Sequence, residues 1–240
     1  NKEKFKIGSV DKKRSFINSA KSFEKNIEIK HTLTYSAKNL PRSNTTQTLT
    51  FEVNQSIILL PKNKMMVRYE DKRIGWFTIN KVNYSSDELK SDEYNIIRRW
   101  RLEPKDIDSY NRGELVEPIK PIIYYLDPAT PLKWRPYFKK GVEDWNISFE
   151  KAGFKNAIIA MDPPSKDVSP DFSPEDIRFS TIRYVASKTR NAVGPSVSDP
   201  RTGEILESDI IWYHNHLRSY RNRYLLETGA ANPKARTLNT

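Results

Sequence analysis

The chain has 240 residues, carries 41 Lys and Arg against 30 Asp and Glu, and has a formal net charge of +11 and no cysteine. This length suffices for one large domain or two small ones that bury a core without covalent links. The absence of cysteine excludes disulfides, thiolate zinc sites, iron–sulfur clusters and a cysteine nucleophile. No apolar run approaches the roughly 20 residues that cross a bilayer. The first ten residues contain neither a methionine nor the apolar core of a signal peptide, so we expect a processed start.

The positive charge raises the question of a polyanionic partner, because basic surfaces attract polyanions by releasing counterions. The excess is spread over both halves of the chain, and acidic residues interrupt the stretches between the densest basic clusters, DKKRSF, RRWR and RSYRNRY. This interruption favours solvated basic faces over a continuous binding stripe, so we do not expect nucleic acid among the partners. A binding module for acidic polymers such as nucleic acid or glycans stays open as the alternative function.

The N-terminal half has the pattern of an antiparallel β domain. Residues 1–25 are polar and basic, which predicts an extended arm or a short helix around residues 15–23. After them, apolar and polar residues alternate, and His31 is most simply one of these strand residues. Strands of an antiparallel meander are expected at residues 27–37, 46–61, 74–85 and 94–104.

A polar segment at residues 105–118 ends in proline and predicts a domain boundary, giving domains at residues 1–117 and 118–240. Beyond it the pattern changes to alternating strands and helices. Residues 130–153 predict one long helix, with Thr130 as its N-cap and Gly153 as its stop. Its aromatic stripe is expected to pack on a sheet. Further strands are expected at residues 121–127, 156–161 and 178–187, a hairpin at 191–214, and a helix from Leu217 that ends at Gly229.

The chain offers few residues for chemistry. His214 and His216 share a face only on a strand, and zinc normally takes three or four protein ligands, so they are expected to end a strand instead. Glu207 and Asp209 alternate along a predicted strand, but no third group completes an acid–base or cation site, which favours an ion-paired or solvated strand end. The sequence contains no GxSxG, GxxxxGK[ST] or GxGxxG motif.

Three phrases stand out from Pro121 onward: KWRPYFKKGVEDWNISFEKAGFKNAIIAMD, IRYVAS and GPSVSDPRTGEILESDIIWYHN. In this order they resemble the N-terminal subdomain of a large bacterial family of zinc-dependent metalloproteases, which are zincins of the metzincin-like type. SFINSAKSFEKNIEIKHTLTYSA and DKRIGWFTINKVNYS are similar to the domain of unknown function that precedes the protease domain in the same proteins. The resemblance covers nearly the whole chain.

The resemblance implies an α+β fold, in which an N-terminal antiparallel β domain precedes a zincin-like subdomain with a mixed five-stranded sheet and helices. In the family, an HExxHxxGxxH helix holds zinc, and its glutamate is the general base for a zinc-bound water. This sequence contains no HExxH. We therefore expect the chain to stop before its catalytic centre, with no catalytic residue, no metal ligand and no proteolysis of its own. Zinc and activity would belong to the full-length protein, with the C-terminal remainder of the protease domain as a partner.

The resemblance also implies a substrate-binding edge strand. Metzincin-like sheets have four parallel strands and one antiparallel edge strand that pairs with an extended peptide or protein substrate. Gly194-Pro195 independently predicts a sheet edge, because proline cannot donate to a ladder. The residues that match this edge strand are Asn191, Ala192, Val193, Gly194, Pro195 and Ser196.

The relatives look exported, which implies a periplasmic or cell-surface location. Residues 1–117 could serve as a segment that covers the cleft.

Overall fold

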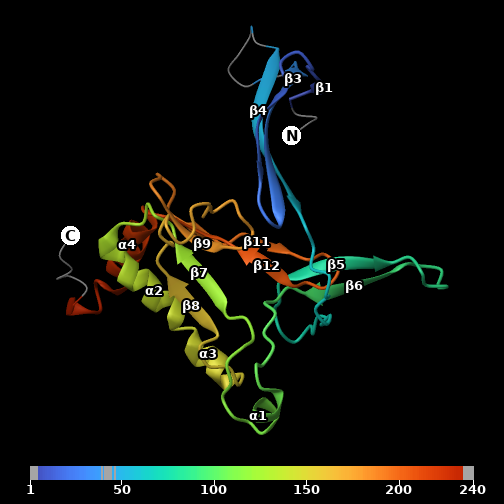
Figure 1. Ribbon diagram of the computed structural model, residues 1–240. Helices are drawn as coiled ribbons and strands as arrows, with labels where there is room; N and C mark the ends of the chain where they lie inside the picture. The colour runs from blue at the N-terminus through green and yellow to red at the C-terminus, as the bar shows by residue number, and fades with distance from the viewer. Residues whose placement is uncertain (1–4, 39, 41–44, 46, 235–240) are drawn as a thin grey trace. The chain divides into compact units, whose positions relative to one another are not determined.

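The computed structural model describes residues 5–38, 40, 45 and 47–234 and shows a mixed α+β protein with mostly strands and few helices (Figure 1). Antiparallel sheets accompany one mixed sheet. Contacts divide the described residues into two units. The first unit runs to Leu60 and includes Glu175–Ile177, and the second contains Pro61–Pro174 and the described residues from Arg178 onward. The predicted domain boundary after residue 117 stays a prediction.

The first unit is an antiparallel sheet built around one long strand. Its strands are β1 (Ile7–Val10), β2 (Phe16–Ser22), β3 (Asn26–Ala37) and β4 (Thr48–Ile58). β3 is central: β1 and β2 follow one another along one side of it, and β4 pairs along the whole of the other side. The strands predicted at residues 27–37 and 46–61 are therefore confirmed. The short helix predicted around residues 15–23 is wrong. The alternative, an extended segment, is correct in its backbone, but this segment is a paired strand because bonding to β3 satisfies its backbone groups.

The two faces of this sheet differ in an unusual way. The polar face holds Glu28, which is buried and accepts hydrogen bonds from the side chains of Asn26, Asn54 and Ser56 at 2.6–2.8 Å. Glu175 adds an ion pair with Lys21 at 2.5 Å on this unit. The opposite face carries apolar side chains that are about half exposed within the described structure, among them Ile27, Phe51, Val53 and Ile57.

The second unit begins with a hairpin and a short helix. β5 (Thr78–Asn83) and β6 (Asp92–Ile97) pair antiparallel, which confirms the predicted pair of strands. They form a sheet separate from that of β3, so the predicted strands do not make one continuous meander. Helix α1 (Ile107–Asn111) follows, and the carboxylate of Asp106 caps it by accepting from two backbone N–H groups.

The second unit contains a mixed five-stranded sheet. Its strands are β7 (Ile122–Leu126), β8 (Ile158–Met161), β9 (Ser180–Val185), β10 (Ala192–Val193) and β13 (Ile210–Tyr213). The spatial order is β10-β13-β9-β7-β8. β13, β9, β7 and β8 run parallel, and β10 pairs antiparallel with β13 at one edge. The interior position predicted for the apolar run at 121–127 is confirmed, because β7 lies between β8 and β9.

The predicted hairpin is broken into two pairs of short strands. β11 (Ser196–Ser198) and β12 (Ile205–Ser208) form a small antiparallel sheet of their own, next to the turn at residues 199–204. Beyond Gly194-Pro195 on one arm and Asp209 on the other, the hairpin continues as β10 and β13. Proline supplies no N–H at this point, so the ladder is interrupted there.

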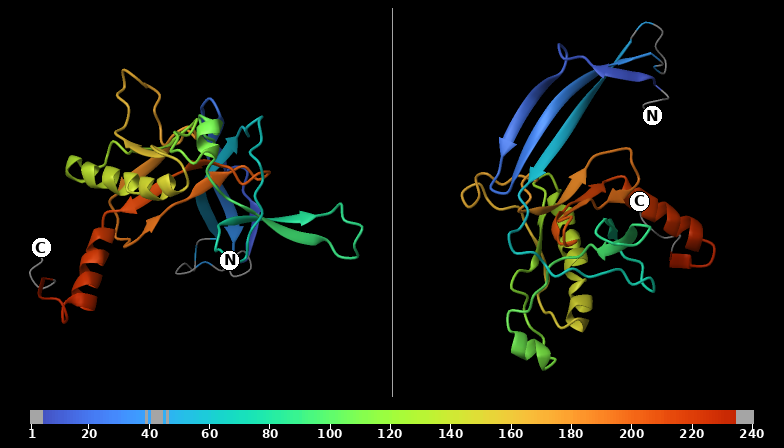
Figure 2. Two further views of the ribbon diagram at one scale, coloured as in Figure 1. Left: turned by 90° about the horizontal axis from the view of Figure 1, so that it is seen from below. Right: turned by 90° about the vertical axis from the view of Figure 1, so that its right-hand side faces the viewer.

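Helices cover one face of the five-stranded sheet (Figure 2). The helix predicted at residues 130–153 is divided into a 3₁₀ turn at Leu132–Trp134, α2 (Arg135–Glu143) and α3 (Asn146–Lys151). Thr130 is not its N-cap, because its side chain makes no capping hydrogen bond. The last helix, α4 (His216–Thr228), ends at Gly229 as predicted. No helix among the described residues is long and apolar enough to span a membrane.

The core of the second unit lies between this sheet and α2. The buried side chain of Val142 points from α2 to the sheet, where Phe138 and Phe149 also pack. The predicted stripe therefore faces the sheet at these three residues, whereas Trp145 of the same stripe is exposed. The sheet residues of this core are Ile122, Tyr124, Leu126, Ile158, Ala160 and Ile182.

Candidate functional site

The edge strand β10 presents backbone groups that no neighbouring strand uses. The backbone N–H of Asp209 donates to the carbonyl of Pro195 at 3.0 Å. In an antiparallel ladder, bonded and non-bonded residue pairs alternate, so Val193 and Pro195 direct their backbone groups inward, toward β13 and Asp209. Ala192 and Gly194 therefore direct theirs toward the open edge. The side chain of Val193 is 41% exposed.

Two side chains limit this open edge. The side-chain oxygen of Asn191 accepts from the N–H of Ala192 at 2.9 Å. At the other end, the guanidinium of Arg98 donates to the carbonyl of Ser196 at 3.0 Å and to the hydroxyl of Ser198 at 2.9 Å. Between these two limits, the described residues leave the carbonyl of Ala192 and both backbone groups of Gly194 without partners. We call these groups the β10 window.

Gly194 lies at the middle of the β10 window, where the structure does not require glycine. A side chain at this residue would meet its nearest neighbour, the carbonyl oxygen of Asp209, only at 3.9 Å, and the backbone has no positive φ. Space and strain therefore do not require glycine here. A side chain at this residue would point away from the plane of the sheet, so alanine would leave the edge as accessible to a second backbone as glycine does.

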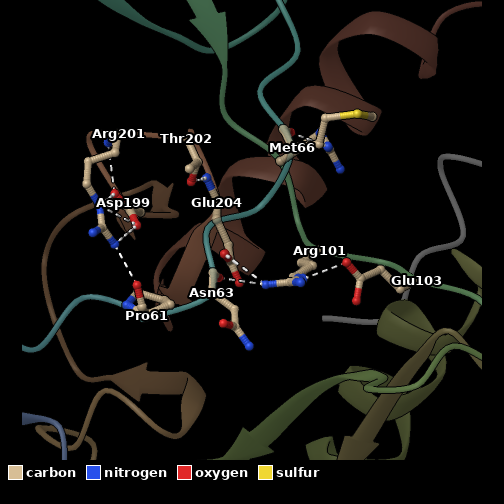
Figure 3. A network of polar contacts seen from close by, with 10 residues as sticks. Pro61, Asn63, Met66, Arg101, Glu103, Asp199, Arg201, Thr202 and Glu204 are labelled. Atoms are coloured by element: carbon tan, nitrogen blue, oxygen red, sulfur yellow. Dashed lines mark hydrogen bonds and ion pairs between the residues drawn. The ribbon is translucent and has the colours of Figure 1, made fainter.

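An arginine-rich contact network supports the hairpin that carries this edge (Figure 3). Arg101 donates to the carbonyl of Asn63 at 3.0 Å, and Arg201 donates to the carbonyl of Pro61 at 2.7 Å. Arg99 donates to the carbonyl of Met66 at 2.9 Å. The loop before β5 is thus tied to the end of the β11–β12 hairpin. Arg99 and Arg101, together with Arg98, belong to the basic cluster RRWR. Their side chains donate hydrogen bonds within the protein and do not form an open basic face.

Buried carboxylates shape the electrostatics of this network. Asp199 is fully buried, and its hydrogen bonds from the Arg201 side chain lower its pKa below the ordinary value. Burial raises the pKa of Glu204, with nearby Arg101 acting in the opposite direction. Gly203 has φ +77°, and a side chain there would collide with the carbonyl of Ile97. The turn at residues 199–204 therefore requires both a buried acid and a glycine.

The two histidines do not fit a zinc site. His214 follows β13 in a turn, and its Nδ1 accepts from the N–H of Ser187 at 3.1 Å. His216 is the first residue of α4, and its ring packs on Trp212 and Tyr220 at centroid distances of 5.0 and 4.5 Å. The pair does not share a strand face, which chelation would require. Within the part of the chain that the structure describes, no three His, Cys, Asp or Glu side chains gather as metal ligands.

Glu207 and Asp209 do not form a carboxylate pair on one strand. Glu207 lies in β12, whereas Asp209 lies between β12 and β13. The carboxylate of Asp209 accepts from the N–H of Thr181 at 2.8 Å and from its hydroxyl at 2.6 Å. Asp209 thus joins the hairpin to β9 through these hydrogen bonds, which differs from the ion-paired or solvated strand end that the sequence predicted.

Sequence reasoning missed an apolar groove of about 690 Å³ between α2, α3 and the five-stranded sheet. The aromatic stripe was expected to be core throughout, but Trp145 is 63% exposed. The unusual number of tryptophans on elements that face one another is the signal that could have suggested an open groove. Its aromatic lining includes Trp100, Tyr124, Trp134, Phe138, Trp145 and Trp212.

Comparison with known proteins gives one match. Residues 1–105 match a family described as Domain of unknown function (DUF5117). No curated protein and no solved structure matches the chain. The match supports the resemblance of the N-terminal part to a domain of unknown function. The resemblance of the later part to zinc metalloproteases stays a prediction.

Proposed function

We propose that the second unit is the substrate-binding part of a zinc-dependent metallopeptidase, and that the β10 window holds an extended peptide by strand addition. The observation that carries this proposal is the open edge itself. Ala192 and Gly194 direct unpaired backbone groups outward at the edge of the five-stranded sheet. In strand addition, such groups provide affinity without any reactive side chain.

The sheet topology supports the same assignment. Four parallel strands and one antiparallel edge strand are the arrangement that the resemblance implies for the upper wall of a metzincin-like cleft. The antiparallel strand falls at Ala192–Val193, within the predicted edge segment at residues 191–196. Peptide binding at this edge also suits a protein whose histidines are engaged in local packing.

The proposal assigns peptide binding, not bond cleavage, to these 240 residues. The sequence contains no HExxH, and the histidines present do not fit zinc. Hydrolysis would require a zinc-binding motif elsewhere in the protein. Reading the gene beyond Thr240 tests this part: an HExxH motif within about the next hundred residues is expected, and its absence there would overturn the enzymatic assignment. The exported location stays part of the proposal.

Substitution of Gly194 tests the peptide-binding part. Gly194→Pro removes the outward N–H, whereas Gly194→Ala keeps it and fits the space available. We expect a fluorescein-labelled casein digest to bind the wild-type chain and the alanine variant alike, as measured by anisotropy. The proline variant should bind about five- to tenfold more weakly, the equivalent of one backbone hydrogen bond. Equal binding by both variants, or none by the wild type, would rule out the β10 window as the site.

A further inference from the structure

The first unit contains a second open edge, on β4, which has a different character. The N–H of Leu59 donates to the carbonyl of Lys25, and the N–H of Ala37 donates to the carbonyl of Gln47, both at 2.8 Å. These two bonds fix the alternation of the ladder between β3 and β4. Odd-numbered residues of β4 bond inward to β3. Even-numbered residues direct N–H and C=O outward, and these are Thr48, Thr50, Glu52, Asn54, Ser56 and Ile58.

The two edges of this sheet are protected unequally. Natural sheets block edge pairing with bulges, short strands, lysine or proline. The edge formed by β1 and β2 has such devices: both strands show register shifts against β3, and Lys12, Lys13 and Arg14 lie between them. β4 has none. It pairs with β3 in unbroken register from Asn26↔Ile58 to Ser36↔Thr48, and its one charged residue is Glu52.

We propose that β4 pairs with β4 of a second copy of this chain, forming an antiparallel dimer with one continuous sheet. A two-fold axis at Val53, the middle residue of β4, would pair the full length of the strand with itself. In this register, each outward-facing N–H and C=O of one β4 meets its counterpart on the other. An isologous contact of this kind needs only one self-complementary surface.

The side chains suit this register on both faces. On the polar face, Glu52 lies opposite Asn54 of the second copy, so that the two glutamates do not oppose one another. On the apolar face, Leu49 lies opposite Ile57 of the second copy, and the two Val53 side chains meet at the axis. Cross-strand apolar pairs of this kind stabilise a sheet. Val53 and Ile57 are 40% and 49% exposed in the single chain, so pairing would cover apolar surface.

A matched pair of variants tests the proposal. Val53 and Ile17 lie in the same row, on either side of His31, with Val53 on the open edge and Ile17 on the protected one. We expect sedimentation equilibrium of the wild-type chain to show a monomer–dimer equilibrium. Val53→Lys should raise the dimer dissociation constant about tenfold or more, because two lysines would meet at the axis. Ile17→Lys should leave it unchanged.

A backbone variant separates edge pairing from a general surface effect. Glu52→Pro removes an outward N–H and spares the ladder with β3, since proline is tolerated where the N–H faces away from the sheet. It should weaken the dimer as strongly as Val53→Lys, with an unchanged circular dichroism spectrum. In the wild type, hydrogen exchange at the amides of Glu52 and Asn54 should slow as the protein concentration rises.

Four results would overturn the proposal. A wild-type chain that stays monomeric at every soluble concentration would remove the dimer. Equal weakening by Val53→Lys and Ile17→Lys would indicate packing of apolar faces rather than pairing of edges, and no weakening by either would place the contact elsewhere. A monomer in which a casein digest alone protects the β4 amides would assign this edge to peptides instead of a second copy.

Discussion

β10 and β4 are both open edge strands, but they expose very different amounts of backbone. Asn191 and Arg98 close the β10 edge at its two ends, and Pro195 interrupts its ladder. β4 offers an outward-facing edge over Thr48–Ile58 without an interruption. A short, bounded edge can hold a segment of peptide and release it. A long, unguarded edge is typical of a stable association with a second strand.

The two edges also differ in the structure that supports them. The β10 window belongs to a sheet with helices packed on one face, and a core that includes Leu126 and Val142 supports it from that face. β4 belongs to a single sheet whose apolar face is uncovered among the described residues. Disturbing the core of the second unit should therefore leave pairing at the β4 edge intact.

The largest effect is expected in the core beneath β10. Leu126 is fully buried, and Leu126→Ala should destabilise the second unit by about 2–5 kcal/mol, because it leaves a cavity. Urea unfolding, followed by tryptophan fluorescence, measures this loss. Leu132→Ala, at a residue that is 77% exposed, is the control. Peptide binding should weaken with Leu126→Ala while the dimer persists, and a joint loss of both would show that the two edges depend on one core.

A smaller effect is expected from the buried acid of the hairpin turn. Asp199 and Asp71 make the same hydrogen bonds to an arginine two residues later, but only Asp199 is buried. Asp199→Ala should cost about 2–3 kcal/mol, because the charge-assisted hydrogen bonds from Arg201 to this buried carboxylate are lost. Asp71→Ala should have no measurable effect on unfolding. Similar losses in both would mean that the local Asp–Arg pair, and not burial, stabilises these turns.

The same aspartate predicts a pH dependence. Hydrogen bonds from Arg201 lower the pKa of Asp199 in the folded protein, so its contribution to stability is complete above the ordinary aspartate pKa. The contribution should be lost as the pH falls through the lowered pKa of the folded state. The stability difference between wild type and Asp199→Ala should therefore be constant near neutral pH and shrink in acid. A difference that grew in acid would contradict this assignment.

The smallest effect should come from widening the β10 window. Asn191→Ala frees the N–H of Ala192, whereas Asn191→Asp keeps an acceptor in place. The alanine variant should bind the casein digest about two- to fivefold more tightly than the wild type, the gain of one backbone hydrogen bond. The aspartate variant should not gain affinity. Unchanged binding by Asn191→Ala would show that Asn191 does not limit the window.

Regular periodicity allowed much of the fold to be predicted. The alternation of Ile27, Ile29, Leu33 and Tyr35 predicts β3, and Gly229 marks the end of α4. β1 and β2 were missed because their sequences are polar, and pairing with β3 makes them strands. The helix break after Glu143 was also missed, because the aromatic spacing continues across it while the backbone does not.

The candidate site, like the fold, could be predicted only in part. Proline at 195 predicts a sheet edge, because it lacks an N–H wherever it is placed. Nothing local indicates that Arg98, almost a hundred residues earlier, closes one end of that edge. The hydrogen bonds from Arg99 and Arg101 to backbone carbonyls could not be predicted from the sequence either. The basic cluster was expected to be a solvated face instead.

The sequence by itself determined the strand and helix periods, the edge character of Gly194-Pro195 and the absence of an HExxH motif, since these are properties of residues and their immediate neighbours. Only the tertiary structure decided which backbone groups remain open at β10 and β4, which arginines are engaged, and why the histidines do not chelate. These features depend on partners far away along the chain, and hydrogen bonds are directional, so a shift of one residue in a ladder would exchange the open groups for bonded ones.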